Sequence, residues 1–320
     1  MCNVRTTCVV AAAALIIVAS GCNAGNENLS PMGPQSLTTH GRTLGPGTRR
    51  TTWAKSVFVS DHFVGKVYQF ADRRNGPVLG TITDSKGPLG LDMDSSGNLY
   101  VAAEGDYAIK VYAPGSYSAT STLSDPGEFI SSVAVCPNGT VYAANEFGFS
   151  QKPGDVAIFA PGAKSPTGTV PDANIYSAAF ATCDANNVLW FTYSNFANEM
   201  QVASYNGVTV TEYGNLHLGT ANSASGIRAL KTGKLAMGNT YVGLNLYHDS
   251  PRKNDPTRPL GCRVGSAITF SFDRSDKQIY EVDSSSSIEK CDISGKQLYT
   301  IGQGTLDTAD DVYAFPGGNN

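Results

Sequence analysis

The stretch Ser96–Tyr112, "SGNLYVAAEGDYAIKVY", decides the fold of this chain. It contains a glycine turn, a run of alternating apolar residues, a short polar loop and a second alternating run, which is the pattern of two antiparallel strands. Asn138–Gly148, "NGTVYAANEFG", and Val156–Gly162, "VAIFAPG", repeat that order farther along the chain. The sequence therefore contains a repeated β unit, and the spacing of its copies predicts the architecture.

The copies can be aligned on the middle of the strand that follows each turn. Successive anchors are 42, 42, 48, 46 and 44 residues apart. The anchor residues are Phe58, Tyr100, Tyr142, Trp190, Ala236 and Tyr280. Four short strands in roughly every 40 to 50 residues is the pattern of a propeller blade. We therefore predict an all-β, six-bladed β-propeller.

The two ends of the repeat region are incomplete in complementary ways. The first unit begins at Trp53 with its anchor strand and has no preceding inner strand. Asp310–Gly318, "DDVYAFPGG", matches the inner strand and turn of Ser131–Gly139, "SSVAVCPNG", with no further strands after it. We predict that this C-terminal strand completes the first blade, because ring closure removes two exposed sheet edges.

Two of the units resemble NHL-type repeats. Their sequences are "PLGLDMDSSGNLYVAAEGDYAIKVYAPG" (Pro88–Gly115) and "ISSVAVCPNGTVYAANEFGFSQKPGDVAIFAPG" (Ile130–Gly162). The first follows the pattern Pro-x-Gly-apolar-x-apolar-Asp, a turn Gly and two strands. The resemblance extends from Trp53 to Gly318 and is weakest in the fifth unit, where Ala236 replaces the aromatic anchor. It implies a six-bladed propeller.

The amino-terminal part of the chain is predicted to lie outside this fold. Cys8–Ala19 is uniformly apolar but shorter than the about 20 residues that span a bilayer, so residues 1–21 are typical of a signal peptide. "ASGC" at Ala19–Cys22 resembles the lipoprotein cleavage box, which implies lipidation of Cys22. An ordinary secretory signal, with Cys22 incidental, is the alternative. Residues 22–50 are rich in Gly, Pro, Ser and Thr and predict a flexible tether, and residues 51–320 the propeller.

These features predict an exported protein that is lipid-anchored to a bacterial membrane and faces the periplasm or the cell surface. Only 16% of the residues are charged and the net charge is −4, which argues against nucleic acid as a partner. We expect a monomer that contacts the membrane only through its anchor. Its partner would be a protein or a carbohydrate that the sequence does not name.

Chemistry in a propeller is expected near the axis, where the inner strands gather. The ionisable residues of the predicted inner strands are Asp92, Arg228, Asp310 and Asp311. The histidines, His40, His62, His217 and His248, all lie elsewhere. We therefore predict no catalytic residue, no metal site and no cofactor, and a non-catalytic binding or scaffold module. The alternative is a metal-dependent hydrolase or lyase at the axis, similar to gluconolactonase-like or streptogramin-lyase-like propellers, since carboxylates can hold hard cations.

A second polar series follows the anchor strands. Its members are Asp61, Glu104, Asn145, Ser194, Asn239 and Asp283. A ring of metal ligands is one interpretation. Turn chemistry is the favoured one, because Asp and Asn side chains bond their own backbone in such loops.

Four cysteines remain after Cys22 and permit three pairings: Cys136, Cys183, Cys262 and Cys291. We expect Cys136–Cys183, because both residues end inner strands of consecutive units, and Cys262–Cys291. Buried free thiols are the alternative. The irregular segment from Tyr247 to Cys262, rich in charge and Pro, is predicted to face a partner.

Overall fold

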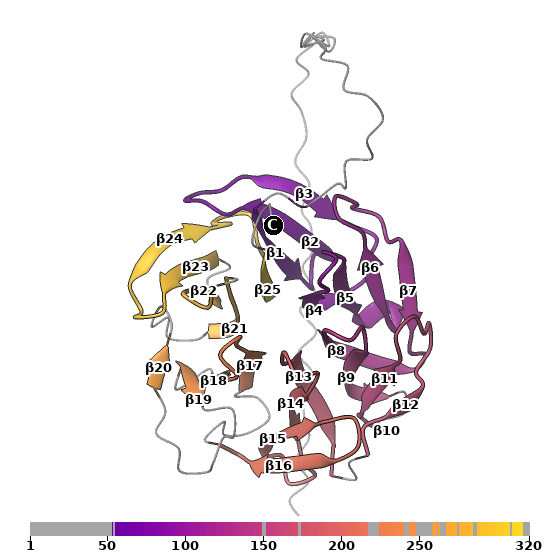
Figure 1. Ribbon diagram of the computed structural model, residues 1–320. Helices are drawn as coiled ribbons and strands as arrows, with labels where there is room; N and C mark the ends of the chain where they lie inside the picture. Colours follow the sequence, from indigo (N-terminus) through magenta and orange to yellow (C-terminus); the bar gives the residue numbers. More distant parts are fainter. Residues whose placement is uncertain are drawn as a thin grey trace, which may run out of the picture. The chain divides into compact units, whose positions relative to one another are not determined.

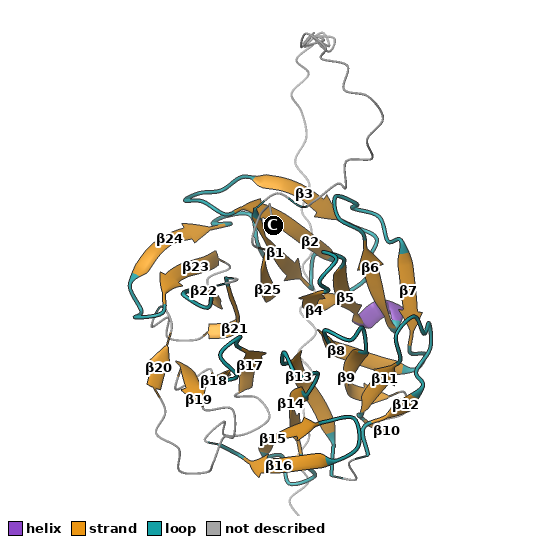
Figure 2. Cartoon of the chain, viewed as in Figure 1, coloured by secondary structure: helices purple, strands orange, loops and turns teal. Residues whose placement is uncertain are grey.

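The computed structural model describes residues 53, 55–148, 152–171, 174–216, 224–239, 243–247, 258–260, 262, 267–273, 275–283, 287–307 and 309–315. The predicted signal peptide, tether and Cys22 lie outside these residues. The part of the chain that is described contains no candidate membrane-spanning helix. Apart from a three-residue 3-10 helix, Glu104–Asp106, the regular structure within it is β-strand (Figure 2).

The described residues form six antiparallel sheets, which Figure 1 shows arranged as a ring of blades. Blade 1 contains, from the axis outward, β25 (Ala309–Phe315), β1 (Ser56–Asp61), β2 (Lys66–Ala71) and β3 (Val78–Ile82). Blade 2 contains β4 (Pro88–Met93), β5 (Leu99–Ala103), β6 (Ala108–Tyr112) and β7 (Ser121–Ser124). Blade 3 contains β8 (Glu128–Val135), β9 (Val141–Gly148), β11 (Val156–Phe159) and β12 (Gly168–Thr169), and β10 (Lys152–Pro153) pairs with the end of β9.

The other three blades follow the same order. Blade 4 contains β13 (Ser177–Cys183), β14 (Leu189–Ser194), β15 (Met200–Tyr205) and β16 (Val210–Gly214). Blade 5 contains β17 (Ala224–Ala229), β18 (Leu235–Asn239), β19 (Gly243–Tyr247) and β20 (Arg258–Leu260). Blade 6 contains β21 (Ala267–Phe272), β22 (Gln278–Asp283), β23 (Ser287–Asp292) and β24 (Gln297–Ile301). The predicted fold class is confirmed.

Blade 1 is assembled from both ends of the repeat region, as predicted. β25 pairs antiparallel with β1, with Tyr313 opposite Phe58 and Asp311 opposite Ser60. Apolar side chains of blades 6 and 1, among them Tyr280 and Phe70, then pack into one buried cluster. The strand at the C-terminal end of the repeats therefore supplies both a sheet partner and a sealed blade interface.

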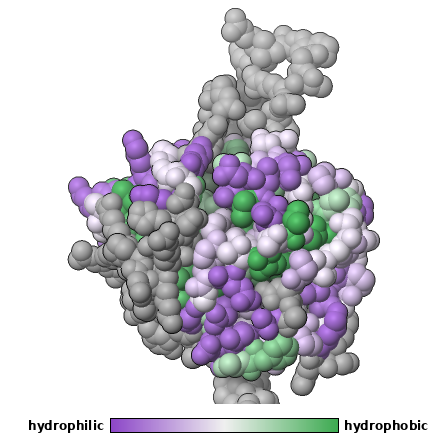
Figure 3. All heavy atoms as spheres, turned by 60° about the horizontal axis from the view of Figure 1, so that its bottom comes forward, coloured by the Kyte–Doolittle hydropathy of each residue, from purple (hydrophilic) through white to green (hydrophobic). Residues whose placement is uncertain are grey.

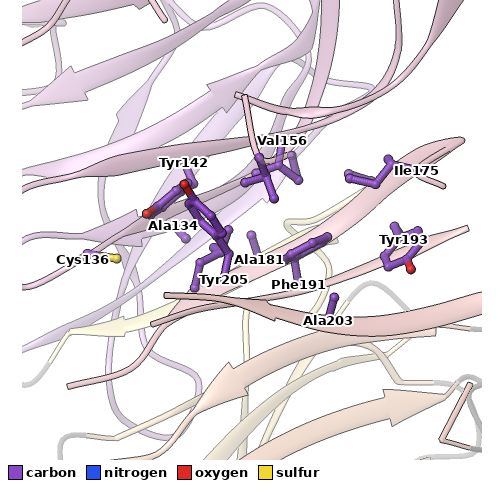
Figure 4. Packing of buried hydrophobic residues seen from close by; sticks show 14 residues of the cluster. Ala134, Cys136, Tyr142, Val156, Ile175, Ala181, Phe191, Tyr193, Ala203 and Tyr205 are labelled. Atoms are coloured by element: carbon purple, nitrogen blue, oxygen red, sulfur yellow. The ribbon is translucent and has the colours of Figure 1, made fainter. Parts of the chain in front are cut away.

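Apolar clusters fill the interfaces between neighbouring blades. Figure 4 shows the one between blades 3 and 4, where Tyr142, Phe191 and Tyr205 pack around Ala134 and Ala181. One side of each inner strand contributes an apolar residue to the interface with the preceding blade. These residues are Leu91, Val133, Ala181, Ile227, Phe270 and Val312. A single blade could not bury these faces alone, which explains the repeated sequence.

The turn from the inner to the second strand places a left-handed residue at the same position in blades 2 to 6. Asp94 accepts the backbone N–H groups of Ser96 and Asn98, each at 2.9 Å, and Gly97 follows with φ +84°. Asn187 holds the equivalent left-handed position in blade 4, with φ +63°. Gly and Asn tolerate this conformation best. The glycine that recurs in these turns is therefore explained by the left-handed backbone conformation that the turn requires.

The antiparallel blades give the ring two distinct faces. We call the face where the inner strands begin the N-face and the face where they end the C-face. The N-face also carries the loops between second and third strands. The C-face carries the turns between third and fourth strands and, in blades 2 to 6, the turns between inner and second strands. On the side drawn in Figure 3, hydrophobic residues reach the surface in small groups among hydrophilic ones.

Candidate functional site

Mainly polar and small residues, with the aromatic Phe180 and Tyr313 among them, occupy the side of the inner strands that is opposite to the apolar row. Alignment on the hairpin turns gives two sets, two residues apart, as strand alternation requires. The first set comprises Gly90, Ser132, Phe180, Gly226, Thr269 and Asp311. The second set comprises Asp92, Ala134, Thr182, Arg228, Ser271 and Tyr313. Together they determine what the axis can bind.

All members of the second set except Ala134 line a cavity of about 370 Å³ that opens among the C-face hairpins. Side chains from all six blades contribute to it, including Asp92, Arg228 and Tyr313. The turn carboxylates Asp94 and Asp184 also border it. No histidine is among the described residues that line it. The lining therefore combines acidic and basic side chains with apolar ones.

Asp311 is the most heavily bonded of the predicted axial residues. Arg228 Nη2 lies 2.9 and 3.1 Å from its two carboxylate oxygens. The backbone N–H of Leu91 and the hydroxyl of Thr269 each donate to it at 2.7 Å, and its neighbour Val312 donates at 2.9 Å. These donors come from blades 5, 2, 6 and 1, so one buried carboxylate joins four blades. Both oxygens are engaged by the protein itself.

Asp92 lies on the next blade and lines the cavity. Its oxygens accept the backbone N–H groups of Val135 in blade 3, at 2.7 Å, and of Met93, at 2.8 Å. Burial raises the pKa of Asp92 to about 6, and the nearby Asp311 adds to this while Arg228 opposes it. A carboxyl in that range could act as a general acid or base. Both carboxylate oxygens of Asp92, however, already accept hydrogen bonds from backbone N–H groups.

Other polar residues of the two sets continue this pattern around the ring. Ser132 Oγ accepts the N–H of Ala181, and Thr182 Oγ1 accepts the N–H of Ala229, each at 3.3 Å. Ser271 Oγ accepts the N–H of Ala314 at 3.3 Å. Each bond runs from one inner strand to the backbone of the next. The polar side chains of the axis thus satisfy interblade backbone groups that would otherwise be buried without partners.

Gly90 shows how closely the inner strands approach. A Cβ at this position would lie 2.5 Å from Ser132 Cα and 3.0 Å from the Ser131 carbonyl oxygen. Both atoms are in or next to the backbone of the neighbouring blade, so they cannot move aside cheaply. The glycine of the "PLG" motif is therefore required because the inner strands of neighbouring blades pack too closely here for a side chain.

Asp310, the fourth predicted axial residue, does not join the other three. It accepts the backbone N–H of His62 at 2.7 Å on the N-face, and burial raises its pKa to about 6. His62 Nε2 lies 3.5 Å from Glu104 Oε2. Burial, and then the charge of Glu104, raises the pKa of Glu146 beside them. The structure therefore separates the candidates into a C-face group and an N-face group.

In the polar series after the anchor strands, Asp61 has the bonds expected of turn chemistry, whereas Glu104 lies 3.5 Å from His62 and Asn145 donates to the carboxylates of Asp125 and Asp155. Asp61, fully buried, accepts the backbone N–H groups of Val64 and Asp307. The side chains of Asn239 and Asp283 lie outside the described residues, as do His40, His217 and His248. Within the described residues, no three His, Cys, Asp or Glu side chains are grouped so as to hold a metal ion.

The loop predicted to face a partner is only partly described. Tyr247 ends β19, and Arg258–Leu260 forms β20, the outermost strand of blade 5. Residues 248–257 and 261 lie outside the described residues. The end of this segment is therefore an edge strand, which the irregular sequence did not predict.

Sequence reasoning missed a second buried ion pair, between blades 6 and 1. Lys290 Nζ lies 2.8 Å from Asp72 Oδ1, and each side chain is 2% exposed. The tyrosines Tyr280 and Tyr299 donate to the same carboxylate, each at 2.9 Å. Burial by itself would raise the pKa of the Asp72 carboxyl. Lys290 and the two tyrosine hydroxyls outweigh burial and hold that pKa below its ordinary value. The residues are more than 200 positions apart in the sequence, so only the ring closure could have suggested the pair.

The four cysteines lie in the two expected pairs. Cys136 and Cys183 join blades 3 and 4 with a Cα–Cα distance of 5.0 Å, and Cys262 and Cys291 join blades 5 and 6 with 5.4 Å. Both distances suit a disulfide. Oxidation in the purified protein stays a prediction: mass spectrometry of unreduced peptides should recover both cross-linked pairs. Recovery of four alkylated cysteines from the unreduced, denatured protein would contradict it.

The raised carboxyl pKa values predict how stability depends on pH. Asp92 and Asp310 have pKa values of about 6 and Glu281 about 7 in the folded protein, all raised mainly by burial. The unfolded chain releases these protons near pH 4, so the folded state binds more protons between pH 4 and 7. Stability should therefore fall as the pH rises through this range. We expect Tm to be several degrees higher at pH 5 than at pH 8, and Asp92→Asn to flatten the slope. A Tm that rises steadily from pH 5 to pH 8 would contradict this.

Comparison with known proteins supports the fold and leaves the family open. No family model matches the chain, and no curated protein matches its sequence. A chain in the crystal structure of a nidogen/laminin complex is similar in structure, with a TM-score of 0.65 and 13% identity over 82% of this chain and 99% of that one. In all, 1369 solved chains are similar to this chain in structure, and at 13% identity the likeness shows the fold alone.

Proposed function

We propose that this chain is a membrane-anchored lipoprotein whose NHL-like propeller is a non-catalytic binding or scaffold module. In this proposal the protein is a monomer and uses no cofactor. The observation that supports this most is the Asp311 carboxylate, which is occupied by Arg228, Leu91, Thr269 and Val312. A catalytic or metal-binding carboxylate needs a free oxygen facing the substrate or ion. Here the axial charge acts as a brace between blades.

The polar groups at the axis are bonded to one another and to the inner strands. The loops on the two faces of the rigid ring are therefore the surfaces available for partners. The partner is a protein or a carbohydrate. The structurally similar chain belongs to a complex of nidogen with laminin, which is an example of a propeller in an assembly between proteins. Fold similarity at 13% identity supports no closer choice.

Calorimetric titration with calcium, magnesium and zinc tests this function against the metal-dependent alternative. We expect no saturable binding at micromolar concentration by the full chain. Asp92→Asn is the informative variant, because Asp92 lines the cavity without joining four blades. Micromolar binding that disappears in Asp92→Asn, with the circular dichroism spectrum unchanged, would instead support a hydrolase or lyase at the axis.

The anchor is tested by Cys22→Ser. Lipidation of Cys22 would hold the protein at the membrane, since two or more acyl chains give stable anchoring. We expect the variant to be unprocessed, or to move from the detergent phase to the aqueous phase in phase partitioning. A Cys22→Ser protein that partitions like the unaltered one would contradict the lipoprotein assignment.

A further inference from the structure

The two faces of the ring differ in charge. Over the N-face segments of blades 1 to 4 and the loop before β25, the described residues include eleven acidic residues and four lysines. The acidic residues are Asp61, Asp84, Glu104, Asp106, Asp125, Glu128, Glu146, Asp155, Glu199, Asp307 and Asp310, and the lysines are Lys66, Lys86, Lys152 and Lys110, which pairs with Asp106. The described C-face turns of all blades carry six acidic and seven basic residues. These are Asp72, Asp94, Asp184, Asp273, Asp276 and Asp292 against Arg73, Arg74, Lys164, Lys231, Lys234, Lys277 and Lys296.

The N-face also carries the most exposed aromatic side chains of the described residues. Phe63 is 76% exposed in the β1–β2 turn, and Phe196 is 64% exposed in the β14–β15 turn. Tyr176 contacts Phe196 with ring centroids 5.4 Å apart and is 39% exposed. On the C-face, the aromatic Tyr117 is bonded to Gln69 and packs on Trp53. Single exposed aromatic residues are common, so these rings carry weight only together with the charge of the same face.

The aromatic residues flank an acidic centre. Phe63 and Phe196 belong to blades 1 and 4, which lie on opposite sides of the ring in Figure 1. Asp310 of the inner strand β25 accepts the backbone N–H of His62, whose ring lies beside Glu104 and 5.4 Å from the ring of Phe63. An extended ligand that runs from Phe63 across the ring to Phe196 would therefore pass this acidic group.

Unsatisfied acceptors lie on the same face. Asn145 is fully buried, and its amide donates to Asp125 and Asp155 while its Oδ1 has no partner. Glu128, 8% exposed, shares one oxygen with Lys152 and leaves Oε2 without a partner. Buried groups without partners are uncommon and call for an explanation. Both acceptors lie on the face that carries the acidic residues.

We propose that the N-face is a docking surface for an extended, arginine- and lysine-rich segment of a partner protein. Guanidinium groups pair with carboxylates and also stack on aromatic rings, which matches both features of this face. A neutral oligosaccharide would use the rings but gain nothing from the surplus negative charge. The inference rests on the proposed function and names its partner class.

Fluorescence anisotropy with two labelled dodecapeptides tests this on the full chain in detergent: one alternating Arg and Ser, the other with Gln in place of Arg. We expect the arginine peptide to bind about tenfold tighter or better than the glutamine peptide and to weaken with added salt. Phe63→Ala combined with Phe196→Ala should weaken the affinity for the arginine peptide about tenfold, as expected for the loss of two cation–π contacts. Val208→Ala is the matched control, since Val208 is 82% exposed in the β15–β16 turn of the C-face.

Equal affinity for the two peptides, or unaltered binding by the double variant, would overturn the inference. If the chain binds maltohexaose and does not bind the arginine peptide, the inference is overturned and the partner class is a carbohydrate. Either result leaves the proposed function standing, because a binding module could still take another partner. The metal titration at the axis tests that function separately.

Discussion

A chain without Asp310–Asn320 is expected to be insoluble, or to melt more than about ten degrees below the full-length protein. These residues include nearly all of β25, the inner strand of blade 1. Their loss would expose the edge of β1 and open the apolar cluster between blades 6 and 1. It would also remove Asp311, and with it the bonds to blades 2, 5 and 6. Terminal residues are usually dispensable, so this outcome would be specific to ring closure.

Differential scanning calorimetry of three proteins gives the measurement. Removal of Gly317–Asn320 alone, which leaves β25 intact, is the matched control and should change Tm little. If the chain that lacks Asp310–Asn320 melts within a degree or two of the full-length protein, closure by β25 is wrong.

Asp311→Ala is expected to destabilise the protein by about 3–5 kcal/mol. The variant would leave Arg228, whose side chain is 13% exposed, without its ion-pair partner. It would also leave the Thr269 hydroxyl and the Leu91 N–H without an acceptor. Removing one member of a buried pair costs more than the pair contributes, because the remaining charge is uncompensated.

The neighbouring carboxylate provides the control for this prediction. Asp310→Ala removes one bond to the His62 backbone and a carboxyl whose pKa is already raised by burial. We expect its effect in urea unfolding to be about 1 kcal/mol or less. Equal effects of the two substitutions would mean that Asp311 does no more than cap a loop.

The fold could be predicted from the sequence because its causes are local and repeated. The turn at Gly97 and Asn98, and its counterparts, require particular backbone conformations that only a few residue types adopt. The alternating strands on either side follow from the same units. Closure by β25 was predictable because Asp310–Gly318 has the pattern of an inner strand without a blade of its own.

The site was only partly predictable. The sequence placed Asp92, Arg228, Asp310 and Asp311 near the axis, but it could not show that Arg228 reaches across the ring to Asp311. That contact depends on the radius of the ring and on the side-chain rotamers. Alignment of the hairpin turns would have found Thr182, Ser271 and Tyr313, which share the register of Asp92. The Asp72–Lys290 pair had no local signal, because it forms only when blade 6 meets blade 1.

The central claim is that the axial charges brace the ring, and a double-mutant cycle on Arg228 and Asp311 tests it most directly. The free energy of unfolding would be measured by urea denaturation for the full chain, Arg228→Gln, Asp311→Asn and the double variant. Groups in one bonded network are not additive, so we predict a coupling energy of about 1.5 kcal/mol or more between the two positions. Additive effects, with coupling below about 0.5 kcal/mol, would contradict the brace and leave Asp311 available for another role.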